Sequence, residues 1–144
     1  SNKEIQEGLN KFLNDSNRSE ILIFDSNKIY LDAYNANPTS MLAAISNFEN
    51  ININNRVLIL GDMFELGEYS DQEHQKIVDF VTNKDYSKIY LVGDNFSKCN
   101  TDGEYFFKFS NTNELEKSDS FKNLKNMNIL VKGSRGVSLE KLFK

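Results

Sequence analysis

Apolar positions recur with two periods along this chain, one typical of strands and the other of helices. Ile29, Leu31 and Ala33 are separated by single residues, which is the two-residue period of a strand. Later stretches are continuously apolar, as expected for strands that are buried on both faces of a sheet. The predicted strands are Glu20–Phe24, Lys28–Ala33, Arg56–Leu60, Lys88–Val92, Tyr105–Phe109 and Asn128–Val131.

The helical period predicts an amphipathic helix over Lys3–Asn14, with Gly8 lowering the helix propensity of its middle. The apolar face of this helix consists of Ile5, Leu9, Phe12 and Leu13. Further predicted helices run from Pro38 to about Glu49, from Asp71 to about Asn83, from Glu114 to about Lys125, and from Ser138 onward. Capping signals support three of these starts: Asn37 before Pro38, Ser70 with Glu73, and Asn111 with Glu114.

Strands and helices alternate from Lys28 onward, which predicts a parallel sheet with helices on both faces. Only Asp25 to Asn27 separate the first two strands, and this spacing favours a tight hairpin with an antiparallel first strand. The predicted fold is α/β: a doubly wound (Rossmann-like), six-stranded, mostly parallel sheet with one antiparallel edge strand. At 144 residues we expect a single domain over residues 1–144.

Charge and composition argue against several classes of function. A net charge of −4 and a pI near 5.1 provide no basic surface for nucleic acid. No apolar run reaches the roughly 18 residues of a membrane-spanning helix, and we recognise no signal peptide. The single Cys99 cannot form an internal disulfide, and one histidine with one cysteine does not make a zinc site of such ligands. We therefore expect a cytoplasmic protein without nucleic-acid or membrane partners and without a metal site in this chain.

Three polar turns follow predicted strands, and the topology places them at the carboxyl edge of the sheet, where α/β folds bind ligands. The second turn offers carboxylates, which suit a cation, an ammonium group or a ribose hydroxyl. The third offers cations and backbone amides, which suit a carboxylate or phosphate. The candidates are Asp32, Tyr34, Asn35 and Asn37 in the first turn, Asp62, Glu65 and Glu68 in the second, and Lys132, Ser134 and Arg135 in the third.

Most candidates also have a structural interpretation. An aspartate at a strand end, such as Asp32 or Asp62, serves as a cap or loop acceptor about as often as it binds a ligand. Structural roles are favoured for Asn37 as a helix cap, Glu65 and Glu68 as solvated charges, His74 as a partly buried packing histidine, and Cys99 as a thiol without a paired base.

The sequence contains neither a GxxxxGK[ST] phosphate loop nor a GxGxxG after a strand. A nucleotide would therefore have its phosphates held mainly by residues outside this chain. A nucleophile, a base and an orienting group cannot be assembled either, so we assign no catalytic residue. The residues alone indicate an α/β ligand-binding domain without a complete active site.

The three turns read DAYNANPTSM, LGDMFELGE and LVKGSRG, in this order. With this spacing the chain resembles the carboxyl-terminal domain of the Mur ligases, of the type that joins D-alanyl-D-alanine (D-Ala-D-Ala) to UDP-N-acetylmuramoyl-tripeptide (UDP-MurNAc-tripeptide). Other branches of the family usually have a His-containing first turn, where this chain has Asn35-Ala36-Asn37-Pro38. Ala33 departs from the family, which often has Ser there.

The resemblance implies the last of three domains of an ATP-dependent ligase in peptidoglycan precursor synthesis. The amino-terminal domain of such enzymes holds the UDP-sugar, and the central domain holds the ATP phosphates and Mg²⁺. ATP phosphorylates the tripeptide carboxylate, and the amine of D-Ala-D-Ala attacks the acyl phosphate. The carboxyl-terminal domain closes over the central one and is expected to be inactive alone.

The resemblance also implies roles for single residues. Nucleotide contacts are implied for Asp32, Tyr34, Asn35 and Asn37, and D-Ala-D-Ala contacts for Asp62, Lys132, Ser134 and Arg135. Two alternatives remain open: a stand-alone α/β ligand-binding or regulatory module, and the equivalent domain of a sibling amino-acid ligase. The central geometric expectation is that the three turns converge on one rim.

Overall fold

A computed structural model describes residues 2–14 and 19–144, without the side chains of residues 11–14. Six strands form one sheet in the order β1-β2-β6-β3-β4-β5. β1 pairs with β2 antiparallel and all other neighbours are parallel, so the predicted fold with its antiparallel edge strand is confirmed. The strands are β1 (Glu20–Phe24), β2 (Asn27–Asp32), β3 (Arg56–Gly61), β4 (Lys88–Val92), β5 (Phe106–Phe109) and β6 (Asn128–Lys132).

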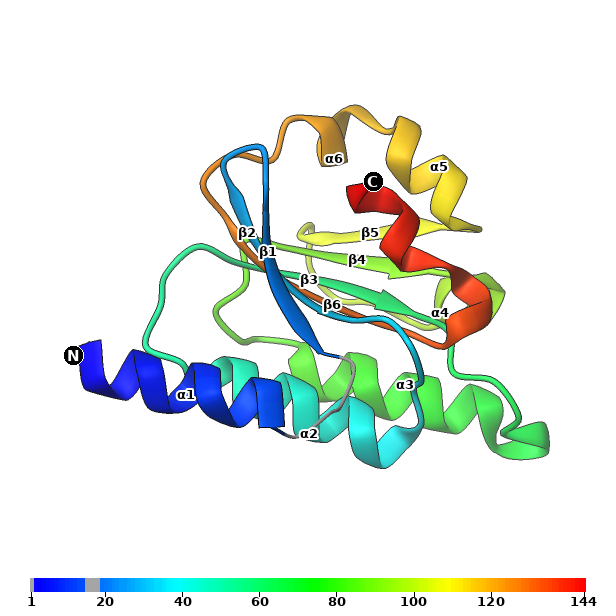
Figure 1. Ribbon diagram of the computed structural model, residues 1–144. Coiled ribbons are helices and arrows are strands. Elements are labelled where there is room, and N and C mark those ends of the chain that lie inside the picture. The colour runs from blue at the N-terminus through cyan, green and yellow to red at the C-terminus, as the bar shows by residue number, and fades with distance from the viewer. Residues whose placement is uncertain (1, 15–18) are drawn as a thin grey trace.

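Helices cover both faces of the sheet (Figure 1). α1, α2 and α3 lie on one face, and α5, α6 and the carboxyl-terminal end of the chain lie on the other. The α-helices are α1 (Asn2–Asn14), α2 (Pro38–Glu49), α3 (Ser70–Val81), α4 (Asp94–Ser97), α5 (Thr112–Lys117) and α6 (Asp119–Lys122). The 3-10 helices are η1 (Gly67–Tyr69), η2 (Arg135–Val137) and η3 (Leu139–Phe143). None of the described helices is both long and apolar enough to cross a bilayer.

Successive residues of the central strands enter different cores. Leu58 and Leu60 of β3 belong to the core beneath α2 and α3, whereas Val57 and Ile59 belong to the core on the opposite face. All four side chains are fully buried. Both faces of the strand are covered, which explains why its sequence is continuously apolar rather than alternating.

The first helix packs on the core through Ile5 and Leu9, as its apolar face predicts. Phe12 and Leu13, predicted to share this face, lie outside the described side chains. Gly8 lies against Ile51, and a Cβ added to it would come 2.9 Å from Ile51 Cγ1. The glycine that lowers helix propensity therefore permits the close approach of the helix to its neighbour.

Two predictions for the helices are wrong. The single helix predicted from Glu114 is broken into α5 and α6, because Ser118 has extended backbone and its Oγ accepts a hydrogen bond from the Phe121 amide. The capping box predicted at Ser70 is absent: α3 follows η1 directly, and the Ser70 hydroxyl lies 3.3 Å from His74 Nδ1. The short helix α4 was not predicted, and the last predicted helix is of the 3-10 type.

The cap predicted at Asn37 is confirmed, whereas only the Asn111 half of the capping box predicted at Asn111 and Glu114 is formed. Asn37 and Ser40 form a reciprocal capping box at the start of α2. Asn111 caps α5 by accepting from the Glu114 amide at 2.9 Å, while the Glu114 carboxylate reaches the Ser110 amide rather than that of Asn111. These caps fix the residues at which α2 and α5 begin.

Candidate functional site

The three polar turns meet at one edge of the sheet. They follow β2, β3 and β6, which are neighbouring parallel strands. The Ser134 amide donates to the Asp62 carbonyl at 3.1 Å, and Lys132 Nζ donates to the Asn35 carbonyl at 3.1 Å. The predicted convergence is therefore confirmed. We call residues 32–38, 61–68 and 132–136 together the carboxyl rim.

The first and third turns are joined by a buried ion pair. Asp32 and Lys132 are register partners on β2 and β6, and Lys132 Nζ lies 2.9 Å from Asp32 Oδ2. Their side chains are only 10% and 3% exposed. The ammonium group of Lys132 thus has two partners inside the rim and does not face solvent.

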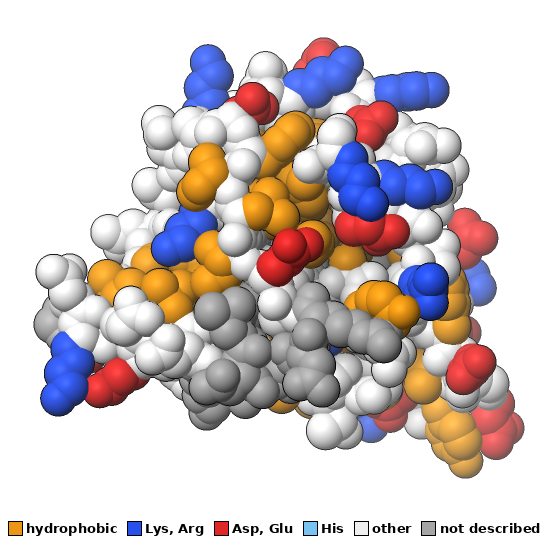
Figure 2. Space-filling model, viewed as in Figure 1, with side chains coloured by type: hydrophobic (Ala, Val, Ile, Leu, Met, Phe, Trp, Pro, Cys, Tyr) orange, Lys and Arg blue, Asp and Glu red, His pale blue; other side chains and the backbone are white. Residues whose placement is uncertain are grey.

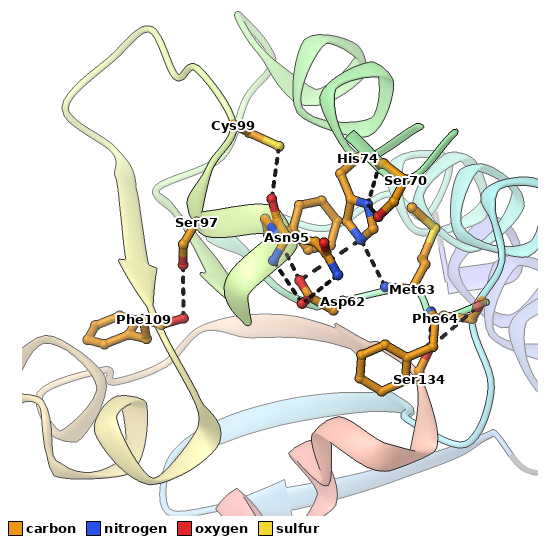
Figure 3. A network of polar contacts seen from close by, with 12 residues as sticks. Asp62, Met63, Phe64, Ser70, His74, Asn95, Ser97, Cys99, Phe109 and Ser134 are labelled. Atoms are coloured by element: carbon orange, nitrogen blue, oxygen red, sulfur yellow. Dashed lines mark hydrogen bonds and ion pairs between the residues drawn. The ribbon is translucent and has the colours of Figure 1, made fainter. Parts of the chain in front are cut away.

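Asp62 anchors the second turn to α4. Its Oδ2 accepts from the amide and the side-chain nitrogen of Asn95 at 2.9 and 3.1 Å, and its Oδ1 accepts from the Phe96 amide at 2.9 Å. Figure 3 shows these bonds converging on the carboxylate. A Cβ added to Gly93, which has φ of +120°, would overlap the carboxylate. Asp62 is 3% exposed, so its oxygens cap a helix rather than face solvent.

His74 packs against the core, as predicted, but it is fully rather than partly buried and has a polar role that sequence reasoning missed. The side chain is fully buried, and its ring lies 4.6 Å from the Phe96 ring in an edge-on arrangement. Nε2 accepts from the Met63 amide at 3.0 Å, which ties the second turn to α3. The partners are eleven positions apart in the sequence, so no short sequence motif reveals the contact.

Phe64 is a rim residue that the sequence reasoning did not select. Its amide donates to Ser134 Oγ at 3.2 Å, and its side chain is 46% exposed. A Cβ added to Gly136 would come 2.9 Å from Phe64 Cε2, so the ring lies directly against the third turn. The available signal was an aromatic residue within a turn rich in glycine and carboxylates.

Tyr34 and Arg135 connect the predicted nucleotide and dipeptide residues on the exposed side of the rim. Arg135 Nη1 donates to the Tyr34 hydroxyl at 3.0 Å, and the guanidinium carbon lies 4.9 Å from the ring centroid. A cavity of about 230 Å³ opens beside them; it is lined by Glu20, Leu31, Ala33, Tyr34, Arg135 and Glu140. The two predicted sets therefore share one surface.

The other rim candidates are exposed. Asn37 caps α2, as the structural interpretation expected, with Oδ1 accepting from the Ser40 amide at 2.9 Å. Asn35, Glu65 and Glu68 also have exposed side chains, which agrees with the interpretation of the two glutamates as solvated charges. Among the described residues, no group of three His, Cys, Asp or Glu side chains is arranged to hold a metal ion.

A second hollow lies away from the rim. Figure 2 shows apolar side chains gathered between the β1–β2 hairpin and the carboxyl-terminal end of the chain. This cavity of about 280 Å³ is lined by hairpin residues such as Asp25 and Asn27, by α6 and by Phe143. It contains none of the predicted site residues.

The Cys99 thiol is expected to be unreactive in the folded protein. It is 6% exposed, and burial raises its pKa to about 11, so about one thiol in a thousand is ionised at pH 8. Reaction with a disulfide reagent at pH 8 should be at least about 100-fold slower in the native protein than in denaturant. Equal rates in the two states would contradict this assignment.

Fold and site together define a class: a doubly wound α/β domain whose carboxyl rim is rich in polar and charged groups but lacks a phosphate loop. Comparison with known families narrows the class. The family model described as "Mur ligase, glutamate ligase domain" matches residues 17–135. The chain belongs to the Mur ligase family.

Individual relatives show the same likeness. UDP-N-acetylmuramoyl-tripeptide–D-alanyl-D-alanine ligase from Buchnera aphidicola is 37% identical over 131 residues, covering 88% of this chain and 28% of the relative. The structure of MurF from Acinetobacter baumannii is 28% identical with a TM-score of 0.71, over 85% of this chain and 28% of that one. MurF ligase from Thermotoga maritima, solved with ADP, is 20% identical with a TM-score of 0.69, over 85% and 28% of the two chains. The chain spans about three tenths of the length of the curated relatives it matches.

Proposed function

We propose that this chain is the carboxyl-terminal domain of an ATP-dependent ligase that joins D-Ala-D-Ala to UDP-MurNAc-tripeptide. The observation that carries the proposal is the match to ligases of this name at 31–37% identity, spanning 86–97% of the chain. The proposed setting is peptidoglycan precursor synthesis in the cytoplasm. Residues 1–144 act as one domain of a longer polypeptide.

In this proposal the chemistry is shared with the rest of the polypeptide. The amino-terminal domain holds the UDP-sugar, and the central domain holds the ATP phosphates and Mg²⁺, for which the described residues of this chain offer no ligand cluster. ATP phosphorylates the tripeptide carboxylate, and the amine of D-Ala-D-Ala attacks the acyl phosphate. Closure of this domain over the central one excludes water from that intermediate.

The proposed dipeptide contact is Arg135. Its guanidinium is exposed at the rim and uses one donor for Tyr34, so a fork of donors remains for a carboxylate. The adjoining cavity of about 230 Å³ is smaller than the roughly 300–1,000 Å³ of drug-sized pockets, and its apolar lining of Leu31 and Ala33 suits small side chains. Asp62, Lys132 and Ser134 have internal partners, so they act by shaping the turns.

The proposed nucleotide contacts lie in the first turn. Tyr34 and Asn35 are exposed there, and Asn37 caps α2 behind them. Asp32 uses Oδ2 for Lys132, so a ribose contact from Asp32 depends on Oδ1. ADP in the Thermotoga maritima relative agrees with a nucleotide site in the full-length enzyme.

The function is tested with the full-length protein that contains this chain. ADP release is measured with UDP-MurNAc-tripeptide and a panel of acceptors that includes D-Ala-D-Ala and single amino acids. We expect turnover with D-Ala-D-Ala and none from the 144-residue chain alone. Preference for a single amino acid would identify a sibling ligase, and no ATP turnover with any acceptor would favour a binding module.

A further inference from the structure

One side chain of α3 holds the second turn of the rim in place. His74 is fully buried, with Nδ1 2.7 Å from the Ser70 carbonyl and Nε2 3.0 Å from the Met63 amide nitrogen. Figure 3 shows the ring between these two backbone groups. Both ring nitrogens are therefore engaged by main-chain partners.

The partners determine the tautomer of His74. The Met63 amide only donates, so Nε2 must carry a lone pair; the Ser70 carbonyl only accepts, so Nδ1 must carry the proton. His74 is thus a neutral imidazole that links α3 to the backbone of the second turn. Asp62 Oδ1 lies 3.9 Å from Nε2 and accepts instead from the Phe96 amide.

The link continues to the exposed surface. Met63 is followed by Phe64, whose amide donates to Ser134 Oγ and whose ring lies against Gly136. On the other side of Met63, the Asp62 carbonyl accepts from the Ser134 amide. The turn that carries Arg135 is therefore hydrogen-bonded to Asp62 and Phe64. These are the two neighbours of Met63, whose amide is held by His74.

We propose that His74 is a positioning residue for the acceptor site: its Nε2 sets the place of Phe64 and, through Ser134, of the Arg135 turn. This inference rests on the proposed function, because the acceptor is taken to be D-Ala-D-Ala. Packing alone does not explain a histidine here, since Ile77, Val78 and Val81 of the same helix are apolar and a buried polar ring is costly unless it is bonded.

Two substitutions of His74 by amide side chains, made in the full-length ligase, distinguish the effect of the Nε2 bond from that of the Nδ1 bond. His74→Gln places its amide oxygen near the position of Nε2 and can still accept from the Met63 amide. His74→Asn places its amide nitrogen near the position of Nδ1, keeps the donor to Ser70 and leaves the Met63 amide without an acceptor. Both lose the ring that packs on Phe96, and Asn is one methylene smaller than Gln, so their packing losses are similar but not identical.

We expect the KM for D-Ala-D-Ala to rise about tenfold in His74→Asn and to stay within about twofold of wild type in His74→Gln. The KM rises in His74→Asn because only this variant leaves the buried Met63 amide without an acceptor. The KM for ATP should change less than about twofold in both. Lys76→Gln, on the exposed side of α3, is the control and should behave as wild type.

A second measurement does not depend on the acceptor. Amide exchange of residues 61–68, followed by mass spectrometry, should be faster in His74→Asn than in His74→Gln or wild type. Equal KM values and equal exchange in the two variants would overturn the positioning role. If His74→Asn does not fold, a tenfold rise in the dipeptide KM of His74→Gln would still contradict it. If the wild type does not use D-Ala-D-Ala, the proposed function is wrong, and exchange alone decides the role of His74.

Discussion

Replacement of Arg135 by alanine in the full-length ligase is expected to raise the KM for D-Ala-D-Ala by about 10- to 100-fold, with the KM for ATP within about twofold. Hydrogen bonds to charged groups contribute about 1.5–3 kcal/mol, and each 1.4 kcal/mol is about tenfold in affinity. Arg135 is the one exposed side chain among the four residues for which the resemblance implies dipeptide contacts, so its removal takes away the proposed direct contact. Steady-state kinetics with each substrate varied in turn provides the measurement.

Two further variants define what Arg135 supplies. Arg135→Lys keeps the charge but loses the fork that binds both carboxylate oxygens, so an intermediate KM is expected. Lys117→Ala removes an exposed cation from α5 and should leave both KM values unchanged. An unchanged dipeptide KM in Arg135→Ala would show that the dipeptide binds elsewhere.

Replacement of Lys132 by methionine should destabilise the 144-residue chain by about 3–5 kcal/mol, the usual loss when one member of a buried ion pair is removed. The carboxylate of Asp32 would then remain buried without its partner at 2.9 Å. Denaturant unfolding gives the free energy of unfolding for the variant and the wild type. Lys125→Met, at an exposed position, is the matched control and should change it by less than about 0.5 kcal/mol.

A double variant separates the ion pair from the loss of the lysine itself. Lys132→Met combined with Asp32→Leu removes both charges and should recover most of the stability. A double variant no more stable than Lys132→Met would contradict the pair as the cause.

In a full-length enzyme with Asp32→Ala that remains folded, a normal KM for ATP would count against the nucleotide role of Asp32.

The strands of the sheet could be predicted because the sequence signal for each strand lies within its own segment. Each strand segment carries its own apolar pattern, and the predicted strand bounds agree with the structure to within one residue at each end. The break at Ser118 could not be predicted from helical periodicity, because it depends on one side chain capping the next helix. The short α4 was missed because its four residues span little more than one helical turn, and its cap comes from Asp62 in the turn after β3.

The place of the rim and the exposure of Glu65 and Glu68 were predictable, but the burial of its aspartates and its lysine was not. Asp32 and Lys132 are 100 residues apart, and Asp62 and Asn95 are 33 apart. Charged residues in a polar turn are expected to be solvated, whereas these partners bury them. Phe64 shows the converse: an apolar side chain is exposed because its backbone is fixed by His74 through Met63 and by Ser134.

The position of D-Ala-D-Ala in the full-length enzyme tests the central claim most directly. A crystal structure with the dipeptide and a non-hydrolysable ATP analogue would show it. We predict the dipeptide carboxylate within hydrogen-bond distance of Arg135, with the ligand beside Tyr34 and Phe64. A dipeptide bound without contact to residues 32–38, 61–68 or 132–136 would contradict the assignment of this rim to the acceptor.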